Sequence, residues 1–243
     1  MRRGSRPRRR LWRSVQAVGL IGLVAAVASA YVPRPEIVAR SAAQTNRKAE
    51  RTQTLQIKVA LKGEDGRTIA EGAVIASPEG RARLEVRSER NGVSRQLRRT
   101  GGLSAARNGQ AQTAPVPVLP PFWLLQARDS GRLLSRLSEL GGNPGAISMG
   151  YEGSSDCYVI GSKNGPSVWI DQDELSVVRI QLGGGLIYRL GPQKGFAGGI
   201  VLPSWVEMEA PGAPRLRLEL QGAQPFEPSD TTFRPDWLIA GAR

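Results

Sequence analysis

Short segments in which apolar and polar side chains alternate run through much of the chain, and this alternation limits the fold to one built on antiparallel strands. Apolar residues occupy every second position in 55–61 and again in 82–86. A period of two puts successive side chains on opposite faces of a strand, so both segments are predicted to be half-buried strands of an antiparallel sheet. The dipeptide Asn91-Gly92 follows the second segment and is typical of a hairpin turn.

The second half of the chain contains the same pattern in paired segments. An apolar segment at 157–160 leads through an Asn-Gly turn at 164–165 into a second segment at 168–171, and a third strand is expected at 175–182. Within 168–171, alternation places Val and Ile on one face of the strand and Trp and Asp on the other. The segments therefore predict a hairpin with one apolar face.

The middle of the chain lacks the alternating pattern and contains a proline-rich segment followed by a helical pattern. Residues 114–121 include four prolines, which lack amide donors and have a fixed backbone angle, so they are predicted to form a stiff extended connector. Residues 122–140 contain leucines at helical spacing and are followed by two glycines, which predicts one long helix. A shorter amphipathic helix is expected at 36–43, just after Pro35.

The number and length of the expected strands constrain their arrangement. A sheet of about eight to eleven strands curls, and strands of eight to ten residues reach about 30 Å. We therefore expect an α+β, mainly β protein with a large curved antiparallel sheet or incomplete β-barrel. The helix at 122–140 is expected to act as a lid over the apolar concave face, with a pocket behind it. Residues 31–243 are expected to form a single domain.

The N-terminus has the organisation of an export signal. Seven arginines within the first 13 residues precede an apolar stretch at 15–27 and three small residues at 28–30. Residues 1–30 are predicted to be a signal peptide cleaved near Ala30, which would place the protein in the periplasm or cell envelope. The alternative is an uncleaved N-terminal membrane anchor, because 15–32 approaches the length of about 18 residues needed for a spanning helix.

Removal of the predicted signal changes the charge balance. The chain has 34 Lys and Arg against 21 Asp and Glu, and seven of the arginines but none of the acids lie in residues 1–30. The remainder is mildly basic, which favours anionic surfaces such as lipid headgroups over a polyanion. Nucleic acid is not an expected partner, because the chain is expected to be exported and its basic segments have no interleaved aromatic residues.

Arginines are concentrated between residues 81 and 107, where two strands are expected. The functional interpretation is that Arg83, Arg87 and Arg95 dock onto anionic headgroups or an acidic envelope protein. The structural interpretation is an outward face of an amphipathic sheet, since alternation alone already directs these side chains to solvent.

The composition leaves little room for catalysis. The chain has no histidine, which removes the commonest general base and the commonest metal ligand. Asp171, Asp173 and Glu174 are expected to form a solvated turn, and the lone Cys157 is expected to be a small core residue. No catalytic residue, metal site or cofactor is predicted.

Three motifs occur in a characteristic order after the N-terminal helix. They are a Pro-Glu-Gly turn that leads into an Arg- and Glu-containing strand at 77–85, the Trp-Ile-Asp hairpin at 169–171, and Phe-Arg-Pro at 233–235. In these motifs the chain resembles the superfamily of outer-membrane lipoprotein carriers and related periplasmic lipid-binding proteins. The resemblance implies an incomplete antiparallel barrel with a helical lid and a hydrophobic cavity for acyl chains, acting without a cofactor. The Arg-rich strands and the proline connector depart from that pattern.

These observations predict a non-enzymatic periplasmic carrier or binding protein for lipids or lipoprotein acyl chains. The alternative is an envelope sensor or assembly factor that binds a protein partner through the same curved sheet. The residues expected to contact an acyl chain come from the lid helix and from the apolar faces of the strands: Phe122, Leu125, Leu133, Leu137, Val168, Ile170, Leu84 and Val86.

Overall fold

The computed structural model describes residues 32–99 and 102–240, and Arg34–Arg243 forms one compact unit. The predicted signal peptide or anchor at 1–30 lies outside the described residues. Within the described ranges, no helix combines the length and the apolar character needed to cross a membrane.

The described residues of this unit contain two α-helices and four short 3-10 turns. Helix α2 begins with a proline, has an acidic residue in its first turn and basic residues in its last, all of which favour the helix at these positions. Helix α3 begins after Asp129, whose side chain accepts a hydrogen bond from the backbone N–H of Arg132. The elements are α2 (Pro35–Lys48), α3 (Ser130–Glu139), η1 (Phe122–Leu124), η2 (Gly183–Gly185), η3 (Ala197–Gly199) and η4 (Pro235–Leu238).

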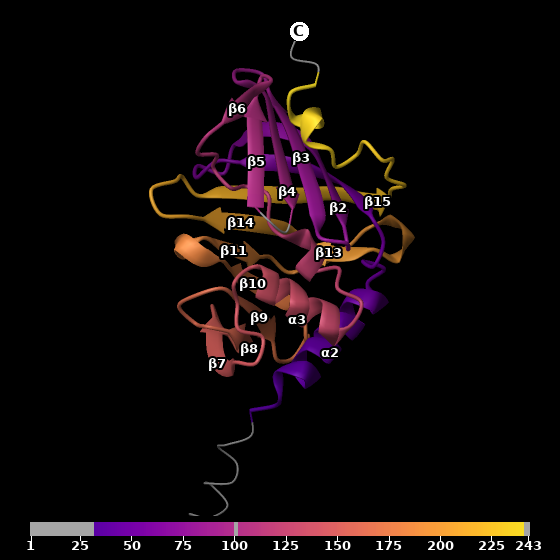
Figure 1. Ribbon diagram of the computed structural model, residues 1–243, viewed down its shortest axis with the longest axis vertical. Coiled ribbons are helices and arrows are strands. Elements are labelled where there is room, and N and C mark those ends of the chain that lie inside the picture. The colour runs from indigo at the N-terminus through magenta and orange to yellow at the C-terminus, as the bar shows by residue number, and fades with distance from the viewer. Residues whose placement is uncertain (1–31, 100–101, 241–243) are drawn as a thin grey trace, which may run out of the picture. The chain divides into compact units, whose positions relative to one another are not determined.

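Thirteen of the strands form one antiparallel sheet in the order β6-β5-β4-β3-β2-β1-β15-β14-β11-β10-β9-β8-β7, and β12 pairs with β13 separately (Figure 1). The described sheet thus has more strands than the eight to eleven that we predicted. The strands are β1 (Leu55–Lys62), β2 (Thr68–Ser77), β3 (Arg81–Ser88), β4 (Gly92–Arg99), β5 (Gly102–Arg107), β6 (Gln110–Gln112), β7 (Ile147–Glu152), β8 (Ser155–Gly161), β9 (Ser167–Asp171), β10 (Val177–Gln181), β11 (Ile187–Leu190), β12 (Gln193–Gly195), β13 (Val201–Pro203), β14 (Trp205–Glu209) and β15 (Leu216–Pro225).

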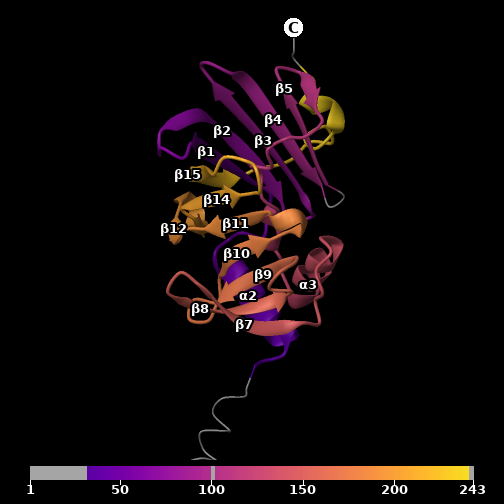
Figure 2. The same cartoon turned by 90° about the vertical axis from the view of Figure 1, so that its left-hand side faces the viewer.

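The sheet is open, because β6 and β7 stand at its two ends and do not pair with each other. The first and last strands in the sequence, β1 and β15, pair with each other in the middle of the sheet. Figure 2 shows how the strand direction turns between β2–β5 and β7–β11. The predicted fold class, a mainly β α+β protein with a large antiparallel sheet that does not close, is confirmed.

One face of the sheet, called the inner face below, packs against the helices. Leu84 and Val86 of β3 and Val168 and Ile170 of β9 lie on this face and belong to one continuous apolar core. Leu133 of α3 is fully buried in the same core. The alternation seen in the sequence therefore marks the inner face correctly.

Two boundaries predicted from the sequence are wrong. The helix expected at 122–140 is confined to Ser130–Glu139, and only a single 3-10 turn precedes it at Phe122–Leu124. Residues 122–125 are all buried, so their consecutive apolar side chains fill a core instead of forming one helical stripe. The strand expected at 175–182 begins at Val177, because Leu175 has a φ of 54° and belongs to the preceding turn.

The C-terminal segment, residues 226–240, covers the outer face of the N-terminal strands (Figure 1). Phe233 and Leu238 of this segment pack with Ile75 of β2 and Leu97 of β4 in a second apolar cluster. The guanidinium of Arg81 lies 5.0 Å from the centre of the Phe233 ring, an arrangement that adds a cation–π attraction. Both faces of this part of the sheet are thus covered.

Substitution of Phe233 by alanine should destabilise the protein through this outer cluster. The ring is 5% exposed, so Phe233→Ala is expected to lower the free energy of unfolding by about 3 kcal/mol. Denaturant titration measures this change. Tyr151→Ala is the matched control, since that ring is 75% exposed and its loss should change the stability by less than about 0.5 kcal/mol. Equal effects of the two variants would show that the C-terminal segment contributes nothing to the fold.

Candidate functional site: a pocket beneath the proline connector

A pocket of about 340 Å³ lies between the inner face of the N-terminal strands and the proline connector, residues 114–121. This volume falls at the lower end of the range of about 300–1,000 Å³ that is usual for small-molecule sites. Its apolar lining comes from β1, β2, β3, β15 and the connector: Leu61, Ile69, Ala70, Leu84, Val86, Leu216, Val116 and Val118.

The polar lining of the pocket comes mainly from β4, β5 and β6, together with Ser88 of β3 and Asn91 of the following turn. The strand register places Val86 opposite Ser94, and Ser94 opposite Arg107, so the three side chains share the inner face. Gln96 and Gln112 also line the pocket. The wall therefore changes from apolar at β1–β3 to polar at β4–β6.

Three buried side chains hold the connector over the sheet. Arg98 donates from Nε to the carbonyl of Leu119 at 2.6 Å and from a terminal nitrogen to the Tyr188 hydroxyl at 2.7 Å. The Tyr188 hydroxyl donates to the carbonyl of Pro117. The side-chain amide of Gln96 both donates to the carbonyl of Val116, at 2.6 Å, and accepts from the N–H of Leu119, at 2.9 Å. The prolines prevent the connector from joining the sheet, and these side chains satisfy its backbone instead.

The electrostatics of this anchor are unusual for a buried cation. Arg98 is 5% exposed and has no carboxylate within 4.0 Å among the described residues. Its charge is instead stabilised by carbonyl and hydroxyl oxygens and by the ring of Tyr188, whose centre is 5.8 Å away. Burial raises the pKa of Tyr188 to about 12, so the hydroxyl stays protonated and able to donate to the connector.

A second buried arginine joins α2 to the β12–β13 hairpin. Arg51 is 1% exposed and donates to the carbonyl of Val201 and to the side chains of Gln193 and Asn46. Burial lowers the pKa of Arg51 to about 10, which leaves it charged at neutral pH. Asn46 in turn donates to the carbonyl of Ala127, and this bond fixes the segment that precedes α3.

The residues predicted to contact an acyl chain all lie in the inner core, but only two of them line the pocket. Leu84 and Val86 form part of its wall. The other six are at most 1% exposed and pack within the core itself: Phe122, Leu125, Leu133, Leu137, Val168 and Ile170.

The arginines considered for surface docking have different positions. Arg83 donates to the carbonyl of Thr232 at 2.9 Å and lies 4.7 Å from the ring centre of Trp237. Arg95 pairs with Glu85 at 2.8 Å and also bonds carbonyls of the C-terminal segment. Arg87 is exposed. Two of the three arginines thus hold the C-terminal segment, and only Arg87 is presented to solvent.

Sequence reasoning missed the polar residues of the pocket and the connector anchor. The position of Arg98 could have been recognised from the sequence. Side chains alternate between the two faces of a strand, so Arg98 lies on the same face as Gln96 and on the face opposite to Arg95. Tyr188 had none, since its partner connector is 71 residues away in sequence.

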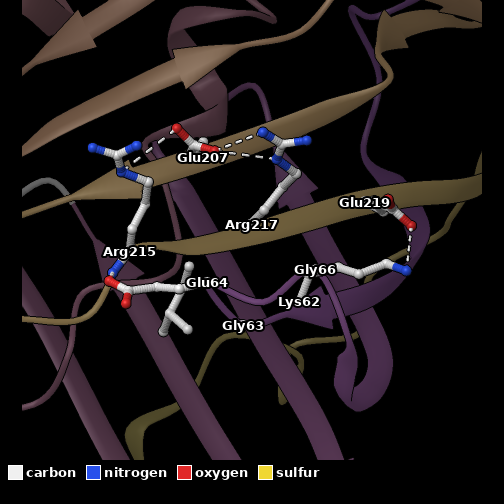
Figure 3. A pocket seen from close by; sticks show the side chains of 9 residues that line it. Lys62, Gly63, Glu64, Gly66, Glu207, Arg215, Arg217 and Glu219 are labelled. Atoms are coloured by element: carbon white, nitrogen blue, oxygen red, sulfur yellow. Dashed lines mark hydrogen bonds and ion pairs between the residues drawn. The ribbon is translucent and has the colours of Figure 1, made fainter.

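A second pocket of about 420 Å³ is lined by charged residues of β1, β14 and β15 (Figure 3). Arg217 pairs with Glu207 at 2.7 Å, Arg215 approaches the same carboxylate at 3.9 Å, and Lys62 pairs with Glu219 at 3.4 Å. Each cation that lines this pocket thus has a carboxylate partner, which makes the group a structural ion-pair network.

The same network continues across the outer face of β10 and β11. Glu152 accepts from Arg179 at 3.1 Å and from Arg189 at 2.8 Å, and Arg189 also bonds Glu209. The hydrogen bond from Arg189 lowers the pKa of Glu209 below its ordinary value. Arg179 stacks on Trp169, with 4.4 Å between the guanidinium carbon and the ring centre. These alternating charges stabilise cross-strand pairs on a face that the main core does not reach.

The remaining candidates for chemistry have structural roles. The Asp171 carboxylate accepts the backbone N–H groups of Asp173 and Glu174 at 2.9 and 2.8 Å, which is the turn expected from the sequence. Cys157 is fully buried, and burial raises the pKa of its thiol to about 11. Within residues 32–99 and 102–240, no group of three potential ligands is placed to hold a metal ion.

Among known proteins, solved structures match this chain at low sequence identity. No protein-family model matches the sequence, and no curated protein does. A LolA superfamily protein from Nitrosomonas europaea is 12% identical, with a TM-score of 0.49 over 81% of this chain and 99% of that one. A putative outer membrane lipoprotein-sorting protein domain from Vibrio parahaemolyticus is 10% identical, with a TM-score of 0.49 over 83% and 97%. The MucA/MucB complex of Pseudomonas aeruginosa gives 12% identity and a TM-score of 0.30 over 86% and 61%.

The family that the sequence motifs resemble is thus represented among the solved structures similar to this chain. These two proteins are 12% and 10% identical to this chain.

Loss of the Arg98 side chain should release the connector. Arg98→Met leaves the Leu119 carbonyl without this donor, so the free energy of unfolding is expected to fall by about 2 kcal/mol. Hydrogen exchange at the Leu119 amide should accelerate with it. Arg99→Met is the control, because that side chain is exposed on the outer face and should alter stability by less than about 0.5 kcal/mol. An unchanged Leu119 amide in Arg98→Met would refute the anchoring role.

The thiol of Cys157 should be unreactive in the folded protein. Its pKa is raised from 9.0 to about 11, so between these values the folded chain keeps the proton that the unfolded chain loses. The thiol's contribution to stability is therefore present below pH 9 and is lost as the pH rises towards 11. Labelling with a disulfide reagent at pH 8 should be complete in denaturant and negligible in its absence. Rapid labelling of the folded protein would contradict this prediction and would favour a reactive thiol at Cys157.

Proposed function

We propose that this chain is an exported, non-enzymatic binding protein of the cell envelope that takes an acyl chain of a lipid or lipoprotein into the pocket beneath the proline connector. The observation that carries this proposal is the pocket itself, in which Leu84 and Val86 of the sheet face the same space as Val116 and Val118 of the connector. A space with apolar walls on two sides favours an aliphatic chain.

Burial of an aliphatic chain can supply enough free energy for binding. Transfer of a methylene group from water to an apolar site contributes about 0.8 kcal/mol, so several buried methylenes offset much of the cost of association. The pocket lies at the small end of the usual range, which favours one chain over several.

A larger cargo would require part of the inner core to move. The connector and η1 occupy the rest of the N-terminal inner face, and η1 lies against β2 and β3. Two polar atoms in and just after η1, Nε1 of Trp123 and Oε1 of Gln126, are buried without a hydrogen-bond partner among the described residues. Each buried atom without a partner destabilises the folded protein by about 1–3 kcal/mol. Moving η1 away from the sheet would expose these atoms to water and so offset part of the free energy that the movement requires.

Catalysis has little support in this chain. The sequence contains no histidine, Asp171 is engaged in a turn and Cys157 is buried with its thiol protonated. The proposal therefore assigns binding alone.

The second candidate is an envelope sensor or assembly factor that binds a protein. It is favoured by β7, the strand at one end of the sheet, where Met149 is 41% and Tyr151 is 75% exposed. An unpaired edge strand with apolar side chains can add a strand from a partner. Mass spectrometry of organic extracts from the purified protein separates the candidates, because only acyl-chain binding predicts stoichiometric lipid.

Filling the pocket should abolish acyl-chain binding without unfolding the protein. Ser94 lines the pocket and is partly exposed, so Ser94→Trp adds an indole to the space without burying a charge. Ligand binding should weaken by at least about tenfold, as followed by isothermal titration with a short-chain lipid.

Ser104→Trp is the matched control, since Ser104 is exposed on the outer face of the adjacent strand β5. It should bind as the wild type does. Equal affinity of both variants, with lipid bound at wild-type stoichiometry, would place the acyl chain elsewhere in the molecule.

A further inference from the structure

The lining of the pocket beneath the connector carries an unbalanced charge. It includes no aspartate or glutamate and one arginine of the inner face, Arg107; Arg95 also borders the pocket, but it belongs to the outer face and pairs there with Glu85. The carboxylates of Asp65, Glu71 and Glu89 line an adjoining groove at the tips of the hairpins. That groove shares Ile69, Ser88, Asn91 and Gly92 with the pocket and also contains Arg67, Arg87 and Arg90. The inner-face lining of the pocket therefore carries one positive charge, at Arg107, beside a wall that is apolar at β1–β3.

The two arginines differ in how they are used. Arg95 is committed to Glu85 and to the C-terminal segment. Arg107 is exposed, and within the described residues its guanidinium forms no ion pair with a carboxylate and no hydrogen bond. It thus presents the full set of guanidinium donors, whose planar fork matches the oxygens of a carboxylate or a phosphate.

The strand register relates Arg107 to the apolar wall. Val86, Ser94 and Arg107 lie in one row across β3, β4 and β5 on the inner face. Neighbouring strands are about 4.8 Å apart, so the backbone at Arg107 lies roughly 10 Å from that at Val86. A chain resting on Val86 would therefore bring its polar end to Arg107, with the hydroxyl of Ser94 between them.

Building on the proposed acyl-chain site, we propose that the ligand is an anionic amphiphile. Its aliphatic chain occupies the wall formed by Leu84, Val86 and Val118, and its carboxylate or phosphate head binds Arg107. The apolar wall supplies affinity, while the charge of Arg107 selects the head and fixes the direction in which the chain enters.

The test compares three probes of equal chain length at submicellar concentration: dodecanoate, dodecyl phosphate and neutral dodecanol. Titration of the purified protein should show that at least one anionic probe binds about tenfold more tightly than dodecanol. Arg107→Gln should remove this preference and leave dodecanol binding unchanged. Arg99→Gln, which removes the same charge from the outer face, should keep it. The tighter anionic probe identifies the head as that of a free fatty acid or of a phospholipid.

Contrary outcomes separate this inference from the proposed function. If all three probes bind equally, the anionic head is refuted while the acyl-chain site stands. If Arg107→Gln retains the preference, the assignment of the head to Arg107 is refuted. Failure of every probe to bind would overturn the acyl-chain site and the head assignment together. Binding to anionic vesicles that depends on Arg87 and Arg90, with no anionic preference among the soluble probes, would overturn the inference in favour of a membrane surface.

Discussion

The pairing of β1 with β15 holds the two halves of the sheet together. It joins an N-terminal meander, β1–β6, to the strands β7–β11 and β14 of the second half, so that thirteen strands share one inner face. The partners are more than 150 residues apart in sequence, as the register of Lys62 with Arg217 shows. Because β15 ends beside the first strands, the segment that follows it reaches the outer face of β2–β5 and covers it. One long-range ladder thus determines how both faces are covered.

The inner face of the sheet has an apolar part that packs into the core and a polar part beside the pocket. Over most of its area, side chains from α2, α3 and η1 fill the space. At β4 the inner-facing residues become polar, and Gln96 and Arg98 hold the connector by its backbone. A connector held by side-chain hydrogen bonds is not part of the sheet, and the space left beneath it is the pocket. The anchor and the pocket are therefore two consequences of the same polar strand.

Most of the fold was predictable from local patterns, and most of the site was not. Strands such as β1 and β3 were evident because alternation is a local property. The helix expected at 122–140 failed because buried apolar residues at 122–125 look the same in a helix and in an irregular core segment. Arg83 and Arg95 looked like a free basic surface because nothing local indicates that Trp237 packs over them. The ion pairs of Arg189 with Glu152 and Glu209 likewise exist only after the folded sheet brings residues of β7, β11 and β14 together.

Composition and contacts between near neighbours were enough to specify the class of fold, the apolar face of each strand, the absence of histidine chemistry and the extended form of the connector. The face on which the connector and the C-terminal segment each lie, the arginines that are paired and the space that remains open followed only from the folded chain. Those properties depend on strand pairing over long separations. Arg107 illustrates the difference: the sequence shows one more arginine in a basic region, and the register places it at the edge of an apolar pocket without a carboxylate.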